Sequence, residues 1–245
     1  MAEASGAARD RVAFIGDAHL DAGLPEVGEF VEFLARLGQR CGRIVLMGDL
    51  FDLWIGRPEL QQPHHEQVLE ALRQLRRQGT VVRYVEGNRD YRIGSAFAGD
   101  AFDDVTEAGL VESIGAKRVF AIHGDLVNRS DRQYRRWRRL SRSSWVWALF
   151  HGIPSALRQR VALRMERKMR GTNLGFKHEF PEHAVREYSA DLFSWGQDIV
   201  VLGHFHVERE LIAEEGGRIL VLPEWKASRR HLEIDSGGGA GFVDS

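Results

Sequence analysis

The sequence predicts an α/β fold in a single domain over residues 1–235, with a helical insertion at about 128–178 and a flexible tail over 236–245. Two observations carry this prediction. Short apolar runs alternate with amphipathic patterns of helical period, as in strand–helix units, and most of these runs end in a polar cluster. A chain of 245 residues can bury one sizeable core, and ordinary domain sizes favour one domain over two.

The first half of the chain reads as strand–helix units. Residues 12–15 are an apolar run, and an amphipathic helical pattern follows over 25–40. A second strand is predicted over 43–47, and apolar residues at helical spacing between 68 and 75 predict the next helix. A third apolar run at 81–85 completes the pattern, so we expect neighbouring parallel strands.

The second half combines further strands with the insertion. Apolar runs predict strands over 118–122 and 199–202, and a helix is expected over about 183–194. Turn residues such as Glu214-Glu215-Gly216-Gly217 separate later strand patterns. These are at 209–213, 218–222 and 231–234. The residues after 235 are rich in glycine, which predicts the flexible tail.

Five of the predicted strands end in clusters with the residue types of a metal site. In chain order the clusters are Asp17-x-His19, Gly48-Asp49-x-x-Asp52, Gly87-Asn88-x-Asp90, His123 and Gly203-His204-x-His206. Open α/β sheets place ligand sites at the carboxyl ends of strands, and carboxylate, imidazole and amide groups are suitable ligands for divalent cations. Any single cluster is more often made of ordinary loop acids and core histidines. The ordered set of five predicts metal chemistry.

The ordered clusters resemble the calcineurin-like metallophosphoesterase family, whose pattern is DxH, GDxxD, GNH(D/E), H and GHxH. The resemblance implies a β-sandwich flanked by helices, and two divalent metal ions that we expect to be manganese. Such ions lower the pKa of a bound water and neutralise negative charge on the phosphate oxygens. By position, the implied ligands are Asp17, His19 and His206 for one ion and Asn88, His123 and His204 for the other, with Asp49 bridging. Asp52 and Asp90 would orient metal-bound histidines.

Arg89 narrows the predicted substrate, because the family pattern usually has histidine there. An arginine offers a planar fork suited to phosphate oxygens rather than a proton for a leaving group. The GNRD cluster with a downstream tyrosine resembles the UDP-2,3-diacylglucosamine hydrolases of lipid A biosynthesis, over roughly residues 11–234. That resemblance implies hydrolysis of a pyrophosphate to 2,3-diacylglucosamine 1-phosphate and UMP, with Asp49, Asn88 and Arg89 as catalytic residues.

The same resemblance implies that the insertion is a cap over the acyl chains of a lipid-linked nucleotide sugar. The implied substrate contacts are Arg89, Asp131, Tyr134, Arg167 and Lys177. The chain departs from the pattern at 124–130, which lacks a common cysteine-containing run, and at Phe205, where threonine is usual. Two other function classes stay open: action on another phosphodiester or phosphomonoester, including nucleic acid or a nucleotide, and a binding scaffold. The second is disfavoured because all seven ligand positions are filled.

The insertion has a charge and composition unlike the rest of the chain. Residues 129–170 contain thirteen arginines and lysines against two acids, while the whole chain has a net charge of −1. Trp137, Trp145 and Trp147 lie among these arginines, as in an interfacial segment that rests on an anionic membrane. The simpler alternative is a pair of helices whose tryptophans pack inward and whose arginines form a face exposed to solvent. Nucleic acid is not expected, because the aromatic residues gather in one run at 145–150.

The remaining sequence features favour a cytoplasmic protein, peripheral at the inner face of the inner membrane. Cys41 is the single cysteine, and the first ten residues have no apolar core like that of a signal peptide. No apolar run is long enough to cross a membrane. Six histidines match no cluster and receive no function: His64, His65, His151, His178, His183 and His231. We expect His64 and His65 to be solvated at the start of a helix.

Overall fold

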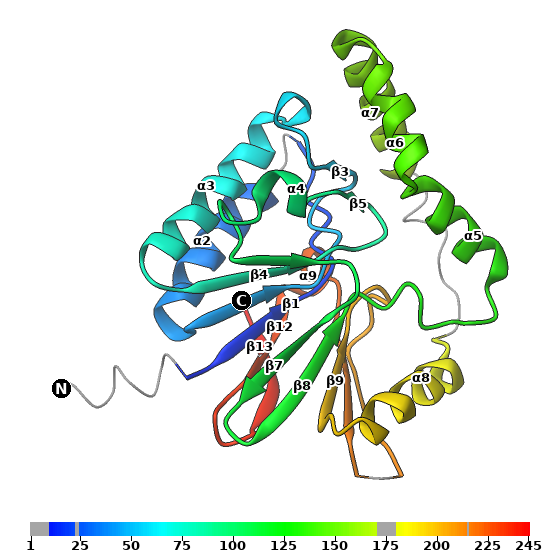
Figure 1. The fold of residues 1–245 in the computed structure, drawn as a ribbon. Helices are drawn as coiled ribbons and strands as arrows, with labels where there is room; N and C mark the ends of the chain where they lie inside the picture. The colour runs from blue at the N-terminus through cyan, green and yellow to red at the C-terminus, as the bar shows by residue number, and fades with distance from the viewer. Residues whose placement is uncertain (1–9, 23–24, 171–179, 215) are drawn as a thin grey trace.

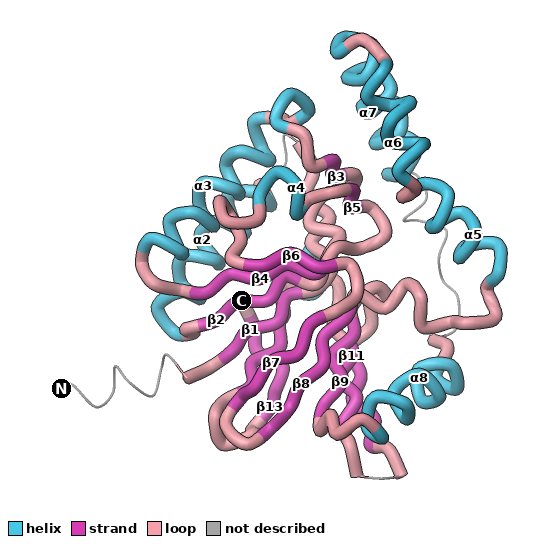
Figure 2. Tube along the Cα trace, in the orientation of Figure 1, coloured by secondary structure: helices cyan, strands magenta, loops and turns pink. Residues whose placement is uncertain are grey.

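Two β-sheets packed face to face form the centre of the molecule, with helices against both outer faces (Figures 1 and 2). The computed structural model describes residues 10–22, 25–170, 180–214 and 216–245. The first sheet has the strand order β13-β12-β1-β2-β4-β6. Its strands are β1 (Val12–Ile15), β2 (Arg43–Leu46), β4 (Val81–Val85), β6 (Asp104–Thr106), β12 (Arg230–Ile234) and β13 (Ala240–Asp244).

The second sheet has the order β10-β11-β9-β8-β7. Its strands are β7 (Leu110–Ile114), β8 (Lys117–Ile122), β9 (Ile199–Leu202), β10 (Arg209–Ile212) and β11 (Arg218–Val221). Strands β1, β2, β4 and β6 are parallel in the first sheet, as are β8, β9 and β11 in the second. A small parallel pair, β3 (Trp54–Ile55) with β5 (Asp90–Tyr91), lies beside them.

Successive side chains of a strand point to opposite faces of the sheet, and this alternation divides the core into layers. Phe14 and Val45 point between the sheets, and Ile15 and Ile44 point toward the helices on the outer face of the first sheet. Strands covered on both faces are apolar on both, which explains why the sequence shows continuous apolar runs there. The apolar side of α8 covers the second sheet, where Val185 packs in the core.

The helices that cover the sheets begin and end close to the predicted positions. The longer ones are α2 (Glu26–Arg40) and α3 (Pro63–Arg77) against the first sheet, and α8 (Glu182–Ser194) against the second. Single-turn helices complete the domain: η1 (Pro58–Leu60), α4 (Gly94–Phe97) and α9 (Trp225–Ser228). The predicted fold class, a β-sandwich flanked by helices with a helical insertion, is therefore confirmed, and strands β3, β5, β6 and β7 are additions to the predicted elements.

The insertion forms three helices that stand to one side of the sheets (Figure 1). They are α5 (Arg132–Ser141), α6 (Ser144–Gly152) and α7 (Ser155–Arg170). Trp147 is buried against Leu53, Ile55 and Tyr91, whereas Trp137 and Trp145 are 54% and 58% exposed. Inward packing thus accounts for one of these three tryptophans, and the insertion keeps an exposed aromatic surface.

The prediction of a flexible tail over 236–245 is wrong. Residues 240–244 form β13, an edge strand antiparallel to β12 in which Phe242 pairs with Leu232. Phe242 packs against the core between the sheets. The glycines that suggested flexibility form the turn before this strand, where the Asp235 carboxylate accepts hydrogen bonds from the backbone N–H groups of Gly237 and Gly239 at 2.9 and 3.0 Å.

The prediction that His64 and His65 are solvated is also wrong. Both side chains are buried, and the ring of His65 lies 4.2 Å from that of Phe51, centroid to centroid. His65 Nδ1 accepts a hydrogen bond from the backbone N–H of Gln62 at 3.3 Å, which closes a capping box at the start of α3. The helix start was predicted, but the loop that packs over it was not.

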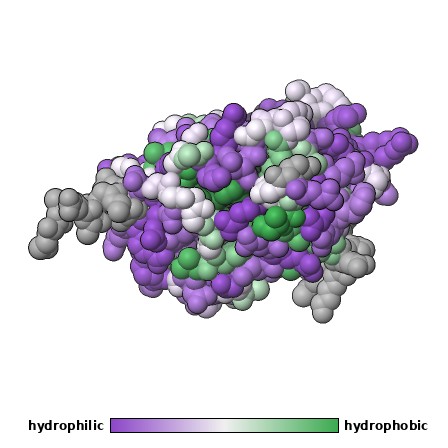
Figure 3. Space-filling view, turned by 90° about the horizontal axis from the view of Figure 1, so that it is seen from below, coloured by the Kyte–Doolittle hydropathy of each residue, from purple (hydrophilic) through white to green (hydrophobic). Residues whose placement is uncertain are grey.

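The outer surface is mostly polar. Figure 3 shows one face of the molecule, on which hydrophobic side chains gather only in small separate patches. Within the described ranges, no helix has the length and apolar character needed to cross a membrane.

Candidate metal centre

The polar clusters converge because the strands that precede them are parallel. Strands β1, β2 and β4 of one sheet, and β8 and β9 of the other, end at the same edge of the sandwich. The loops after these strands carry all seven predicted ligands: Asp17, His19, Asp49, Asn88, His123, His204 and His206. The structure therefore brings together side chains that lie up to 189 positions apart in the sequence.

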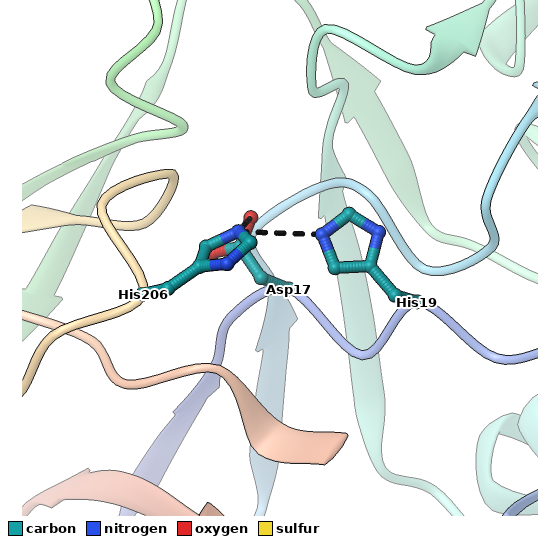
Figure 4. Close-up of side chains that lie close together, drawn as sticks. All are labelled: Asp17, His19 and His206. Carbon is teal, nitrogen blue, oxygen red and sulfur yellow. Dashed lines mark hydrogen bonds and ion pairs between the residues drawn. The ribbon is translucent and has the colours of Figure 1, made fainter. Parts of the chain in front are cut away.

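Asp17, His19 and His206 form the first group (Figure 4). His206 Nε2 lies 3.3 Å from His19 Nε2 and 3.4 Å from Asp17 Oδ1. Asp17 Oδ1 and His19 Nδ1 are buried and have no hydrogen-bond partner among the described residues. Buried polar atoms without partners are costly, and a cation at the centre of the group would satisfy Asp17 Oδ1, while His19 would offer it Nε2, the ring nitrogen that faces His206.

Asn88, His123 and His204 form the second group. Asn88 Oδ1 lies 3.0 Å from both His123 Nε2 and His204 Nδ1. The other ring nitrogen of His123, Nδ1, donates to the backbone oxygen of Met47 at 2.7 Å. This bond fixes the ring so that the lone pair of Nε2 points toward Asn88, the arrangement that metal-binding histidines commonly have.

Asp49 lies between the two groups. Its Oδ1 is 3.8 Å from His123 Nε2, and a ligand atom of Asp49 lies within 4.8 Å of those of Asp17 and His123. Burial and the charge of Asp17 raise the pKa of Asp49, since two buried carboxylates oppose each other's ionisation. Divalent cations between these carboxylates would remove that conflict, so the residues fit a metal site.

The histidines at the site are held in different electrostatic surroundings. Burial lowers the pKa of His204 to about 4, which keeps its ring neutral and able to bind a metal. Burial acts in the same direction on His206, but the adjacent Asp17 carboxylate outweighs it and raises the pKa of His206 to about 9. A metal bound by His206 must therefore displace a proton from it.

Asp90 does not orient a histidine, contrary to the prediction. Its Oδ2 accepts hydrogen bonds from the backbone N–H groups of Asp49 and Gly87 and from the Tyr84 hydroxyl, at 2.9, 2.7 and 2.7 Å. Burial and the charge of Asp49 raise the pKa of Asp90 to about 7. Asp90 thus fixes the backbone of two metal-site loops. Asp52 Oδ1 faces His19 Nδ1 at 3.9 Å, which is beyond hydrogen-bond distance.

Arg89 is at the metal site, where the sequence placed it. Its backbone N–H donates to Asp49 Oδ1 at 2.9 Å, and its Nε lies 3.6 Å from Asp49 Oδ2. Its Nη1 donates to the backbone oxygen of Asp52 at 3.1 Å. The guanidinium is therefore buried beside the carboxylate that lies between the two groups.

The other residues predicted to contact the substrate differ in exposure and in hydrogen-bond partners. The Tyr134 hydroxyl donates to Oδ2 of Asp125 at 2.5 Å, and Asp125 lies two residues after His123 in the chain. The Asp131 carboxylate caps α5 by accepting from the Tyr134 backbone N–H at 2.8 Å. Arg167 is exposed on α7, and its Nε donates to the backbone oxygen of Leu163 at 3.2 Å. Lys177 lies outside the described residues.

Two residues at the site were missed in the sequence. Glu224 Oε2 lies 3.8 Å from His206 Nδ1, and Lys226 Nζ donates to the backbone oxygen of His19 at 3.3 Å. Both follow β11, which runs parallel to β9. The rule that found the other clusters, polar residues after a parallel strand, could have found these as well.

A family model for calcineurin-like phosphoesterases matches residues 10–208. This match covers most of the chain, including every loop of both ligand groups. The chain belongs to the calcineurin-like phosphoesterase family. The predicted resemblance is thereby confirmed, and so is a metal-dependent phosphoesterase as the class of enzyme. The family and the Asp and His groups described above together indicate a divalent metal site.

Several curated relatives within this family share one name. The UDP-2,3-diacylglucosamine hydrolase of Sodalis glossinidius is 29% identical over 92% of this chain and 94% of its own length. The proteins of that name from Haemophilus influenzae and Ralstonia nicotianae are 28% and 32% identical, over 94% and 87% of this chain and 97% and 83% of theirs. Among solved structures, an archaeal phosphodiesterase has the same fold at 10% identity, with a TM-score of 0.50 over 95% of this chain and 98% of its own.

Proposed function

We propose that this phosphoesterase hydrolyses the pyrophosphate of UDP-2,3-diacylglucosamine to 2,3-diacylglucosamine 1-phosphate and UMP. The observation that carries the proposal is the placement of Arg89 beside Asp49, which puts a buried guanidinium fork at the metal site. Relatives named for this substrate, which match the chain over most of its length, support it. Hydrolysis of another phosphodiester or phosphomonoester is the alternative.

The metal assignment follows the two groups of side chains. Asp17, His19 and His206 would hold one ion, and Asn88, His123 and His204 the other, with Asp49 shared. Manganese is proposed from the family resemblance, and the mixed nitrogen and oxygen ligands accommodate it as they do other divalent ions. When bound, the two ions supply an activated water and neutralise charge on the phosphate oxygens.

The protein groups around this site bind and orient the substrate. Arg89 brings a planar guanidinium, a group suited to diphosphate oxygens, to the site, and its contacts with the Asp52 backbone and the Asp49 carboxylate hold it in place. The role of the guanidinium is to bind charge that builds on the phosphate rather than to transfer a proton. The Tyr134 hydroxyl is placed near the same edge through Asp125. Asp131, Arg167 and Lys177 remain predicted contacts.

The insertion provides an apolar place for the acyl chains. A cavity of about 260 Å³ lies between α7 and the segment that runs from β3 to the start of α3. Its apolar lining comes from both sides: Leu53, Ile55 and Leu60 from the domain, and Ala162 and Leu163 from α7. Polar side chains such as Gln62 and Glu166 complete the lining, and we place part of the acyl portion along its apolar side.

The exposed face of the insertion would contact the membrane that holds the lipid substrate. Trp137, Trp145 and Leu149 are 54%, 58% and 66% exposed on α5 and α6. Helices α5 and α7 carry most of the arginines of the insertion, so the insertion combines apolar anchors with positive charge. This composition favours a peripheral position on an anionic leaflet, at the inner face of the inner membrane.

The test is release of UMP from UDP-2,3-diacylglucosamine by the purified chain with added Mn²⁺, beside bis(p-nitrophenyl) phosphate. We expect Arg89→Ala to reduce kcat/KM for the lipid nucleotide by about 100-fold, because a charge-assisted contact to the phosphate is lost. Asp49→Ala should abolish turnover of both compounds. Turnover of bis(p-nitrophenyl) phosphate alone by the unsubstituted chain would overturn the substrate proposal and leave the metal assignment standing.

A further inference from the structure

Arg142, at the carboxyl end of α5, reaches from the insertion into the metal-site loops. Its Nη2 donates to the backbone oxygens of Gly87 and Asp90, at 2.5 and 2.6 Å. Its Nη1 donates to Glu86 Oε2 at 3.0 Å and lies 3.1 Å from Glu107 Oε2. The Arg142 side chain is 10% exposed and Glu86 3%, so these bonds are largely shielded from water.

The two carbonyl groups that Arg142 binds are the ends of the turn that carries Asn88 and Arg89. The Asp90 backbone N–H and the Gly87 oxygen are 3.4 Å apart, which is a weak closure for such a turn. On the inner side, the Asp90 carboxylate binds the backbone N–H of Gly87 at 2.7 Å. Arg142 holds the outer side, so the turn is fixed from both directions.

The contact is part of a larger docking of the insertion on β5. The Arg142 guanidinium lies 5.3 Å from the centre of the Tyr91 ring, and the buried Trp147 ring lies 5.8 Å from the same ring. Trp147 Nε1 donates to the Ser141 backbone oxygen at 3.0 Å, which fixes the junction of α5 and α6. Because this junction is rigid, Arg142 has a defined position relative to the turn.

We infer that Arg142 is a positioning residue for the metal centre: it holds the turn at 87–90 so that Asn88 reaches its metal and Arg89 reaches the phosphate. The inference rests on the metal assignment proposed above. A guanidinium donates to several acceptors in one plane at once, which an ammonium group cannot do. Groups that hold the ligands of a metal change its affinity even though they do not touch it.

The experiment titrates MnCl₂ into the metal-free full chain and its variants by calorimetry. Arg142→Lys keeps the charge but loses the fork. The double variant Arg142→Gln with Glu86→Gln removes both charges of the buried pair, so no uncompensated carboxylate is left to unfold the chain. Arg139→Ala, an exposed arginine on the same helix, is the matched control. Cooperative thermal unfolding establishes that each variant is folded.

We expect one of the two Mn²⁺ ions to bind about tenfold more weakly in both Arg142 variants, while the ion held by Asp17, His19 and His206 keeps its affinity. Turnover of bis(p-nitrophenyl) phosphate should fall at limiting Mn²⁺ and recover largely at saturating Mn²⁺. Arg139→Ala should match the unsubstituted chain. Two ions bound with unchanged affinity in a folded Arg142 variant would overturn the inference. The titration contains no lipid nucleotide, so a wrong substrate assignment would not alter it.

Discussion

Strained backbone conformations are concentrated in the residues of the metal centre. Asp17, His19, Asp49, His204 and His206 have φ angles between 37° and 69°, the left-handed region that costs a non-glycine residue roughly 1 to 3 kcal/mol. Hydrogen bonds between loops hold them there. The His19 backbone N–H donates to the Asp49 oxygen at 3.0 Å, and that of His204 donates to Asp17 Oδ2 at 2.7 Å. The folded domain thus stabilises a geometry that the loops alone would not adopt.

His65 illustrates a cost that burial places on a single titratable side chain. Burial lowers the pKa of His65 to about 2, so its ring is neutral in the folded protein. The unfolded chain, with an ordinary histidine pKa near 6.5, binds a proton more tightly. Stability is therefore complete above about pH 6.5 and is lost as the pH falls toward 2.

His65→Gln should reduce this acid sensitivity. Glutamine keeps the capping-box acceptor at the start of α3 and does not titrate. Between pH 7 and pH 5, the loss in free energy of unfolding should be smaller than in the unsubstituted chain by about 2 kcal/mol. Urea unfolding at the two pH values measures it, with the exposed His183→Gln as control. An equal loss in all three proteins would show that His65 does not carry the effect.

At the scale of elements, the insertion helices differ from the other helices of the described ranges by exposing several large apolar side chains. Helix α5 has no buried residue, and its contacts with the domain are ion pairs and hydrogen bonds such as that between Arg138 Nε and Asp125 at 2.5 Å. Helix α6 supplies the buried Trp147. The insertion is therefore fixed along one side, and its other side is open to a membrane.

We expect the chain to sediment with anionic vesicles at low salt and to be released at high salt, because screening weakens its attraction to the surface. Replacing Trp137 and Trp145 together by alanine should weaken binding several-fold by removing the apolar anchors. Trp195→Ala is the matched control, since that tryptophan is 70% exposed but lies at the end of α8. Equal binding of all variants, or binding to neutral vesicles that ignores salt, would contradict the proposed surface.

At the scale of the whole molecule, one buried carboxylate joins the two sheets. Glu112 on β7 is 1% exposed, and it accepts hydrogen bonds from Arg43 of β2 and Arg83 of β4 at 2.8 and 2.7 Å. Strand β7 belongs to the second sheet, and β2 and β4 belong to the first. The ion pairs therefore fix one sheet against the other at the edge of their apolar interface.

Glu112→Gln should lower the free energy of unfolding by about 2 kcal/mol. Removing one partner of a fully buried pair costs roughly 3 to 5 kcal/mol, and the two arginine side chains here are 28% and 33% exposed, which reduces the cost. Glu210→Gln, in an exposed pair with Arg218, should change stability by less than about 1 kcal/mol. Urea unfolding of both variants measures these changes. Equal losses in free energy of unfolding would argue against a bridge between the sheets.

The sequence by itself determined the strands of the two parallel groups, apart from β6, and the polar residues that follow five of them. Apolar runs and their alternation are local signals, and a parallel strand presents its ligand residues at its carboxyl end whatever the rest of the fold does. For that reason residues 12–15 and 199–202 were predicted as strands with Asp17 and His204 beyond them. The family pattern then assigned the ligands, because it depends on order and spacing alone.

Only the tertiary structure decided which distant segments meet. The burial of His65 under Phe51 and the pairing of β13 with β12 leave no local signal in the sequence. The same is true of Arg142, one of thirteen basic residues in the insertion, which the docking of α5 places against the turn at 87–90. Such contacts follow from the path of the chain, since their energy comes from burial and geometry between residues far apart in sequence.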